Sequence, residues 1–295
     1  MTDSAAPPSS GELAPPRPAA SLVLLRDADG GLEVLMLERT PDDNVLAGAH
    51  VFPGGKLDRE DGEDDSLTRF DVGPAVLHTR LGEPELEARE SAALFVAAVR
   101  ECFEETGVLL ARGIEEAQAV RARALRRDGH GFTELMSALD LRFDATLMEP
   151  WSRWITPKVP AMMRKRFDTR FFIARLPEGQ AAEPDLREAV AARWMAPRDA
   201  LRRYSAQEID MAAPQIMTLA HLSRFPDVAT AMAEAARRPP PVIRPEPIES
   251  PEGRLICYPG DPAHPVRERA MPGPTRLLFA GGRFRPEGGF DAWFE

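Results

Sequence analysis

Residues 97–108 read AAVRECFEETGV, and this stretch decides the fold of the chain. As a helix, it places Glu101, Glu104 and Glu105 at positions i, i+3 and i+4, so their carboxylates share an arc of roughly 100°. The opposite arc is apolar, which predicts packing against a sheet. Its residues are Phe95, Val96, Val99, Cys102 and Phe103. Gly107 follows, where helices commonly end in a left-handed residue.

Three like charges on adjacent turns repel one another, which costs an isolated helix a few tenths of a kcal/mol per pair. A hard divalent cation such as Mg²⁺ or Mn²⁺ would offset this repulsion, because such ions prefer oxygen ligands. A solvated helix face is the simpler interpretation of a glutamate cluster. A metal site therefore needs support from a second part of the sequence.

That support lies upstream, where residues 50–58 read HVFPGGKLD. A short apolar run that is broken by Pro53, Gly54 and Gly55 is typical of a strand that turns into a loop. Glycine has no β-carbon, so the backbone of such a loop can approach a metal ion or a phosphate closely.

Together the two stretches resemble the signature of the Nudix hydrolases, G-x5-E-x7-R-E-U-x-E-E-x-G-U, in which U is aliphatic. Gly55 matches the opening glycine. The second half is matched by Arg100, Glu101, Glu104, Glu105, Gly107 and Val108, with Cys102 at one aliphatic position. The signature is split, because 45 positions separate Gly55 from Arg100 where the unsplit form has 14, so 31 residues are extra. A buried cysteine behaves as a small hydrophobe, so Cys102 is a mild departure.

A split after Phe-Pro-Gly-Gly resembles the peroxisomal-type acyl-coenzyme A diphosphatases and their bacterial relatives. Residues 34–40 (VLMLERT) and 166–172 (RFDTRFF) also match that subgroup. Two positions differ from it. Ala92 stands where the unsplit signature has a glutamate, which leaves open what braces Arg100. Asn44 stands where the coenzyme A motif has an arginine, which weakens the substrate assignment more than the reaction type.

The resemblance covers about residues 21–235 and implies an α+β fold, a Nudix α/β/α sandwich with a mixed sheet. Two insertions are expected, at about residues 59–90 and 112–150. Residues 1–20 are rich in Ala, Pro and Ser, which predicts disorder. The Pro-rich residues 236–295 predict an extended arm with two or three short strands, packed on its own subunit or on a partner. The acidic run Asp58, Glu60, Asp61, Glu63, Asp64 and Asp65 is interpreted as a solvated loop.

Hydrophobic periodicity and turn residues predict the remaining elements. The expected strands are residues 21–25 and 32–38 in a hairpin, then 49–52, a strand ending at 156, 171–176 and 189–195. The expected helices beyond the signature are residues 114–126, 131–139, 197–203, 214–224 and 227–237.

The resemblance also implies roles for the site residues. Glu101, Glu104 and Glu105 would hold the Mg²⁺ or Mn²⁺ ions, with the backbone carbonyl of Gly54. Such ions neutralise charge that develops on phosphoryl oxygens and lower the pKa of an attacking water. Arg100 would brace the glutamates; the alternative is an ordinary surface ion pair, worth ~0–1 kcal/mol.

Glu188 is a candidate general base, with Glu183 as a second candidate; the alternative is that both are loop or edge-strand carboxylates. Arginines pair with phosphates in bidentate fashion, so Arg39, Arg166 and Arg170 are candidates for binding the substrate. The last two lie in a basic group with Arg164 and Lys165. A solvated edge strand of alternating pattern explains that group equally well.

The amino-acid composition limits the binding partners and the cellular location that we expect. The net charge of −10 argues against an extended nucleic acid as a partner, but not against a small anionic substrate. The two cysteines, Cys102 and Cys257, predict no disulfide framework and a cytoplasmic location. We expect neither a membrane span nor a secretory signal, because no run reaches roughly 18 apolar residues and the N-terminus lacks a basic start. The scattered histidines predict no zinc site. A homodimer is compatible with these features.

Three functions remain open. The first is hydrolysis of the diphosphate of coenzyme A or acyl-CoA to adenosine 3′,5′-bisphosphate and (acyl-)phosphopantetheine. The second is the same chemistry on another nucleoside diphosphate derivative, such as ADP-ribose or NADH, which Asn44 keeps in view. The third is a Nudix-fold binding module without turnover, which the intact glutamates argue against.

Overall fold

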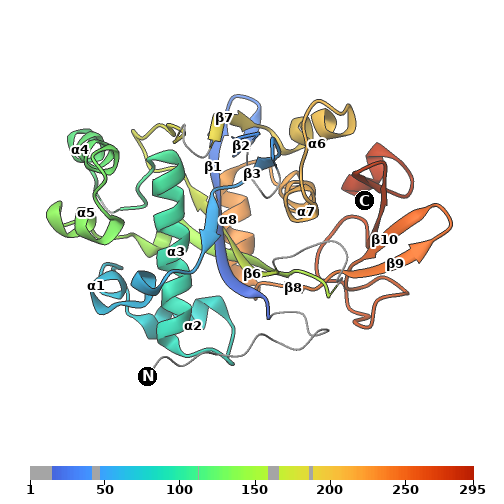
Figure 1. Cartoon of the computed structure of the whole chain (residues 1–295), viewed down its shortest axis with the longest axis horizontal. Helices are drawn as coiled ribbons and strands as arrows, with labels where there is room; N and C mark the ends of the chain where they lie inside the picture. The colour runs from blue at the N-terminus through green and yellow to red at the C-terminus, as the bar shows by residue number, and fades with distance from the viewer. Residues whose placement is uncertain (1–14, 42–46, 112, 159–165, 186–188) are drawn as a thin grey trace, which may run out of the picture.

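The computed structural model describes residues 15–41, 47–111, 113–158, 166–185 and 189–295. An eight-stranded sheet lies between two layers of helices (Figure 1). Its strands are β1 Arg17–Ala28, β2 Gly31–Arg39, β3 His50–Val51, β4 Gly54–Lys56, β5 Met148–Ile155, β6 Phe167–Arg175, β7 Ala189–Met195 and β8 Val242–Ile243. Their order is β3-β2-β1-β6-β5-β8, with β4 paired to β1 and β7 paired to β2. The β1–β6 and β5–β8 pairs are parallel and the others antiparallel, so the predicted mixed sheet is confirmed.

β1 and β2 form the predicted hairpin, in which Ala28 pairs with Gly31. Their side chains alternate between the two faces, because successive residues of a strand point in opposite directions. Leu22 and Leu24 pack on one face, and Val23 and Leu25 pack on the other. β1 begins at Arg17, so the predicted disordered tail is too long by at least residues 17–20. Residues 1–14 of that tail lie outside the described part of the chain.

The signature helix is α3, Ala88–Thr106. It ends as predicted at Gly107, whose φ is +69°. The predicted apolar arc is buried against the sheet. Ala92, which lies within the same arc, and Ala93 and Ala97, which lie outside it, are buried as well. α3 is therefore a central helix with protein on most of its sides.

The two insertions cover the outer side of α3 (Figure 1). The first forms η1 Arg59–Gly62, α1 Asp64–Leu67 and α2 Pro74–Leu81. The second forms α4 Glu116–Arg127, α5 Phe132–Ala138 and η2 Ala145–Leu147, and its two α-helices confirm the prediction. The insertions meet at Phe143, whose ring centroid lies 5.1 Å from that of Phe70 and 5.6 Å from that of Phe132.

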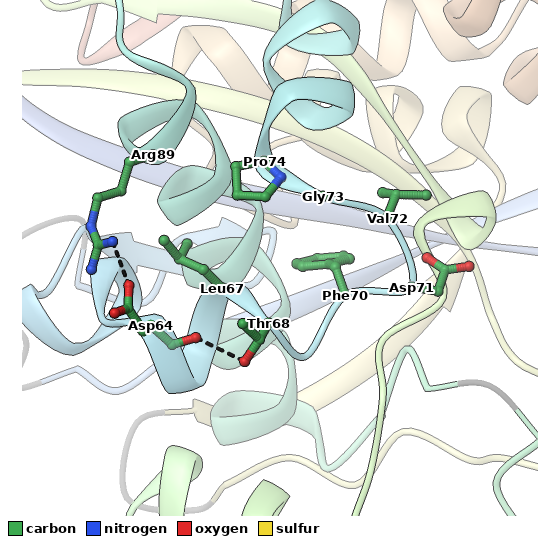
Figure 2. Close-up of a pocket in the computed structure, with 9 residues that line it drawn as sticks. All are labelled: Asp64, Leu67, Thr68, Phe70, Asp71, Val72, Gly73, Pro74 and Arg89. Atoms are coloured by element: carbon green, nitrogen blue, oxygen red, sulfur yellow. Dashed lines mark hydrogen bonds and ion pairs between the residues drawn. The ribbon is translucent and has the colours of Figure 1, made fainter.

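A pocket of about 340 Å³ opens beside α1 and the segment leading to α2 (Figure 2). Its lining is mainly apolar, with Leu67, Phe70 and Val72, and it includes the ion-paired Asp64 and Arg89. None of the residues predicted for the active site lines it.

The opposite face of the sheet carries α6 Pro197–Ser205, α7 Ala213–Leu222 and α8 Val228–Arg237, all three as predicted. The C-terminal arm adds a four-stranded antiparallel sheet on this side. Its elements are β9 Glu246–Ser250, β10 Gly253–Cys257, β11 Arg276–Ala280, β12 Arg283–Pro286 and η3 Phe290–Phe294. This sheet is more regular than the extended arm that the sequence predicts.

The arm packs on its own chain. Tyr258 makes an edge contact with Trp154 at 5.7 Å between ring centroids. The Tyr204 hydroxyl donates to the Phe284 carbonyl at 3.1 Å and accepts from the Phe284 N–H at 2.7 Å. β8 pairs with β5 and so extends the main sheet by one strand. Among the described helices, none is both long enough and apolar enough to cross a membrane.

Candidate active site

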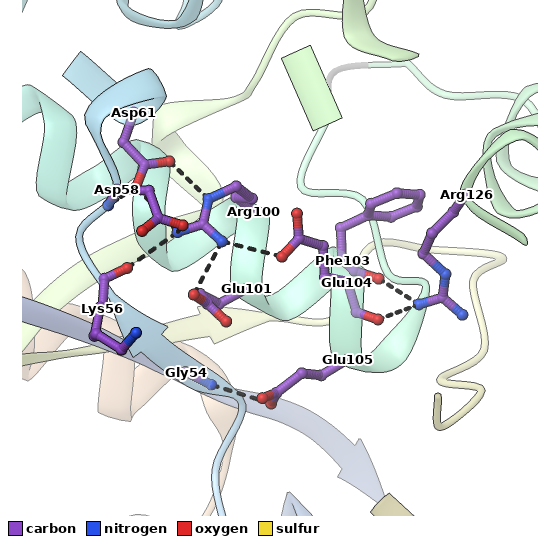
Figure 3. Close-up of polar contacts among 10 residues, drawn as sticks. All are labelled: Gly54, Lys56, Asp58, Asp61, Arg100, Glu101, Phe103, Glu104, Glu105 and Arg126. Atoms are coloured by element: carbon purple, nitrogen blue, oxygen red, sulfur yellow. Dashed lines mark hydrogen bonds and ion pairs between the residues drawn. The ribbon is translucent and has the colours of Figure 1, made fainter. Parts of the chain in front are cut away.

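The two halves of the split signature meet in space. β4 pairs antiparallel with β1, with Gly54 opposite Ser21, and this pairing holds β4 beside the C-terminal half of α3. The Gly54 N–H donates to Glu105 Oε2 at 3.1 Å, although 51 residues separate them in the chain (Figure 3). Gly54 therefore lies beside the glutamates of α3, as the sequence predicts. The group that Gly54 turns to Glu105 is its amide, whereas the resemblance implied a role for its carbonyl.

A β-carbon on either glycine of this turn would meet a close neighbour. On Gly54 it would lie 2.6 Å from the Ala20 carbonyl oxygen, which is backbone and cannot move aside. On Gly55 it would lie 2.5 Å from Cδ of Glu101, the end of a flexible side chain. Gly54 therefore lets β4 approach β1, and Gly55 makes room for the Glu101 carboxylate.

The three glutamates differ in their surroundings. Glu105 is 6% exposed. The side chains of Glu101 and Glu104 are 14% and 41% exposed, and both accept from Nη1 of Arg100, at 2.9 and 3.0 Å. A solvated helix face does not describe this arrangement, because two of the three carboxylates are largely enclosed and each is hydrogen-bonded.

Arg100 is 8% exposed and is held on its other side by Asp61. Its Nε and Nη2 donate to Asp61 Oδ1 and Oδ2 at 2.7 and 3.0 Å, and Nη2 also donates to the Lys56 carbonyl at 3.1 Å. Burial alone would lower the pKa of Arg100, but the Asp61 hydrogen bonds and the charges of Glu101, Asp61 and Glu104 raise it well above its ordinary value. The surface ion pair considered for Arg100 is therefore wrong.

Asp61 is 1% exposed, so the interpretation of the acidic run as a solvated loop is wrong at this position. It belongs to η1, and its Oδ2 also accepts from the Asp58 N–H at 2.8 Å. The sequence carried a signal for a carboxylate from this run, but not for Asp61 in particular. Ala92 removes the glutamate of the unsplit signature, and the acidic run next to Gly55 offers a replacement carboxylate.

The second insertion supports the C-terminal end of α3. Nη1 of Arg126 donates to the Phe103 carbonyl at 2.7 Å and to the Glu104 carbonyl at 2.5 Å. The N–H groups of Asp185 and Glu183 donate to the carbonyls of Glu105 and Thr106, at 2.9 and 2.7 Å. The last carbonyls of the helix are thus satisfied, which fixes the turn that carries Glu104 and Glu105. Sequence reasoning missed Arg126, because no local pattern distinguishes it from the other arginines of α4.

The other residues that the sequence predicts for the site lie in different parts of the chain, and some lie outside the described residues. Glu188 and Asn44, together with Arg164 and Lys165, lie outside the described residues. The Glu183 carboxylate lies 3.7 Å from Nε of Arg123. Arg39 ends β2, where its N–H donates to the Ala49 carbonyl at 3.1 Å. Nη2 of Arg166 donates to the Thr156 carbonyl at 3.0 Å.

Arg170 differs from the expectation for a substrate-binding residue. It is 4% exposed, and its Nη2 lies 2.6 Å from Glu83 Oε2 and its Nη1 3.1 Å from Asp168 Oδ2. A buried guanidinium between two carboxylates is a structural ion pair. The geometry therefore gives no support to the predicted phosphate contact of Arg170.

The donor set is suited to a hard divalent cation, because three carboxylates lie on one helix face beside a glycine turn. Among the residues that the structure describes, however, no three His, Cys, Asp or Glu side chains converge on one point. Glu101 and Glu104 are turned toward Arg100, and Glu105 toward Gly54. These side chains have to rotate if they are to bind one ion together.

Cys102 takes no part in this site. It is fully buried, and burial raises the pKa of its thiol to about 12, so it behaves as an apolar residue of the core, as predicted.

Comparison with known proteins agrees with this geometry. The family model of the NUDT19 Nudix domain matches residues 9–222. The human acyl-coenzyme A diphosphatase NUDT19 is 32% identical over 232 residues, which cover 66% of this chain and 61% of the human protein. The chicken protein of the same name is 27% identical over 308 residues, which cover 84% of this chain and 80% of that protein. The match to the human protein thus spans about three fifths of its length.

Among solved structures, a Nudix hydrolase from Alicyclobacillus acidocaldarius is similar, with a TM-score of 0.57 and 29% identity. The similarity covers 74% of this chain and 96% of that protein. The chain therefore belongs to the Nudix family, in the group that the NUDT19 Nudix domain defines. The predicted α+β Nudix fold is confirmed.

Proposed function

We propose that this protein is a metal-dependent diphosphatase that hydrolyses coenzyme A or acyl-CoA. The products would be adenosine 3′,5′-bisphosphate and phosphopantetheine or its acyl derivative. The relatives named acyl-coenzyme A diphosphatase support the substrate class. The observation that carries the proposal is the Gly54–Glu105 hydrogen bond, because it joins the two halves of the split signature into one site.

Glu101, Glu104 and Glu105 would hold the metal ion, with the backbone at Gly54 beside them. Mg²⁺ and Mn²⁺ are the candidates, because carboxylate oxygens suit both. Such an ion neutralises charge on the phosphoryl oxygens and lowers the pKa of a bound water. The chain's own residues supply the positioning: Gly54 orients Glu105, and Arg100 orients Glu101 and Glu104.

The diphosphate would lie against this helix face, and Arg39 and Arg166 remain the candidates for binding its phosphates. Glu188 remains the candidate general base. Both assignments come from the sequence, and the described contacts of Arg39 and Arg166 neither add to them nor oppose them.

A substrate panel tests the proposal. The protein is incubated with Mg²⁺ or Mn²⁺ and coenzyme A, several acyl-CoAs, ADP-ribose or NADH, and the products are identified by mass. We expect adenosine 3′,5′-bisphosphate from the coenzyme A compounds and none when EDTA is present. Preference for ADP-ribose or NADH would overturn the substrate class. If no compound of the panel is hydrolysed, the result would favour a binding module without turnover.

We also propose a cytoplasmic location, since Cys102 and Cys257 are both free and buried and need no oxidising compartment. A localisation experiment with the tagged full-length chain tests this. The predicted homodimer has no support from the described residues or from the relatives.

A further inference from the structure

The Arg100 guanidinium divides its hydrogen bonds between two groups of acceptors (Figure 3). Nη1 donates to Glu101 and Glu104, which are predicted metal ligands. Nε and Nη2 donate to Asp61, which is not part of the signature, and Nη2 also donates to the Lys56 carbonyl beside it. Arg100 therefore connects the predicted metal ligands to a carboxylate that the first insertion supplies.

Arg100 and a metal ion would share the same two carboxylates, because Nη1 already takes Oε1 of Glu101 and Oε2 of Glu104. Glu101 and Glu104 have to reorient when they bind a cation together with Glu105, because among the described residues the three carboxylates do not converge, and this movement weakens their bonds to Nη1. A buried guanidinium that loses its acceptors is unstable, since a charge in the interior needs a partner. Another acceptor must therefore stabilise the Arg100 guanidinium when the metal ion is bound.

We propose that Asp61 is the positioning residue that holds Arg100 while Glu101 and Glu104 bind the metal ion. It takes the place of the glutamate that Ala92 removes from the signature, and it is supplied by the inserted segment. This inference rests on the proposed function, because it assumes that the glutamates are metal ligands.

Asp61 is suited to this role because it stays in place without help from the metal site. Its side chain is almost fully buried, and its Oδ2 is also held by the Asp58 N–H in the capping box of η1. Its two bonds to Arg100 are parallel and bidentate, the arrangement that fixes the plane of a guanidinium most firmly. Without Asp61, Arg100 would keep the Lys56 carbonyl and the Asp58 carboxylate at 3.6 Å, but its bidentate partner would be lost, and it would depend more on Glu101 and Glu104.

The test compares Asp61→Asn with Asp65→Asn. Asp65 lies in the same acidic run but is exposed, so its variant controls for the loss of one negative charge near the site. Mn²⁺ binding is measured by calorimetry, and turnover of coenzyme A is measured as a function of Mg²⁺ concentration. Losing a residue that supports metal ligands typically weakens affinity or activity about 10–100-fold. We expect a loss of that size in Asp61→Asn and wild-type values in Asp65→Asn. Asp61→Glu, which keeps the charge, should recover part of the loss.

The inference is overturned if Asp61→Asn binds Mn²⁺ and turns over substrate like the wild type. A lower melting temperature as its only defect would make Asp61 a purely structural residue. If Asp61→Asn shows no cooperative melting, Asp61→Glu takes its place, with weaker Mn²⁺ binding expected and wild-type binding as the overturning result. A wild-type protein that binds Mn²⁺ but hydrolyses no substrate would refute the proposed function alone, because the binding comparison still decides the role of Asp61.

Discussion

The first insertion contributes two buried carboxylates, Asp61 and Glu83, and the arginines that they bind differ in their other contacts. Asp61 binds Arg100, which also binds Glu101 and Glu104 of the signature. Glu83 binds Arg170 and Arg153, which also bind Asp168 of β6. No predicted metal ligand bonds to either of these two arginines in the contacts that the structure describes.

The difference shows that a buried ion pair does not by itself reveal a function. The Arg100 cluster includes side chains that must move if a cation binds. The Arg170 cluster ties α2 and the segment after it to strands β5 and β6, and its members already satisfy one another. We therefore expect substitutions in the first cluster to change catalysis and substitutions in the second to change stability.

The largest effect is expected for Glu105→Gln. The amide can still accept from the Gly54 N–H, so the fold should persist, but the charge toward the cation is lost. We expect turnover to fall on the order of 1,000-fold with little change in melting temperature. Steady-state kinetics with coenzyme A and a thermal melt measure both quantities. Unchanged turnover would mean that the metal ion is held elsewhere.

A stability effect is expected for Glu83→Gln, because it removes the charge of one of the two carboxylates between which the buried Arg170 lies. Breaking a buried pair by removing one partner costs about 3 kcal/mol. Urea denaturation measures the loss, and the turnover of the folded protein should be retained. Glu85→Gln is the matched control, since Glu85 also pairs with Arg153 but is exposed, and we expect a change below about 0.5 kcal/mol. Equal losses in the two variants would contradict the comparison.

Gly54 and Gly55 are adjacent, and we expect a substitution at the first to change stability and one at the second to change metal binding. Alanine at Gly54 would meet the backbone of β1, which cannot yield, so we expect a loss of about 1–3 kcal/mol in the free energy of unfolding. Alanine at Gly55 would meet only the end of the Glu101 side chain, which can rotate. Gly55→Ala should therefore retain most of its stability and bind Mn²⁺ more weakly. Calorimetry and denaturation of both variants check this, and a Gly55→Ala protein with wild-type Mn²⁺ affinity would refute it.

The effect that is smallest at neutral pH is a pH dependence outside both clusters. Burial lowers the pKa of His221 to about 3, with smaller contributions from Arg238 and Arg224. The unfolded chain binds a proton at this residue near pH 6.5, and the folded chain does not. Stability contributed by neutral His221 is therefore present above pH 6.5 and is lost as the pH falls toward 3, by up to about 1.4 kcal/mol per pH unit.

The measurement is the free energy of unfolding between pH 7 and pH 5. His221→Gln should flatten this profile relative to the wild type, while the exposed His130→Gln should leave it as it is. If the free energy of unfolding of His221→Gln depends on pH as it does in the wild type, other groups cause the loss of stability at low pH. The other variants are best compared above pH 6.5, where this contribution is constant.

Local signals in the sequence predict much of the fold. The helix from Ala88 to Thr106, the β1–β2 hairpin and the three helices on the other face have clear periodicity, caps or turn residues. The meeting of Gly54 with Glu105 follows from the resemblance, because 51 residues separate the two. No local rule predicts it.

The parts that were missed depend on partners distant in sequence. Asp61 resembles its exposed neighbours until Arg100, 39 residues later, is placed beside it. Short strands are predicted in the C-terminal arm, but their pairing into one four-stranded sheet is hidden, because Cys257 of β10 pairs with Arg276 of β11 across a loop of 18 residues. Short strands with a long connection leave no clear period in the sequence.

The pairing of β8 with β5 has a consequence for where the folding unit ends. The family match stops at residue 222, but the outer edge of β5 is paired with β8, at residues 242–243. A chain shortened to residue 222 would expose that edge and uncover the indole of Trp154, and bare strand edges recruit other chains. The residues after 222 thus cover a strand edge that would otherwise promote self-association, and a chain shortened to the family match should aggregate.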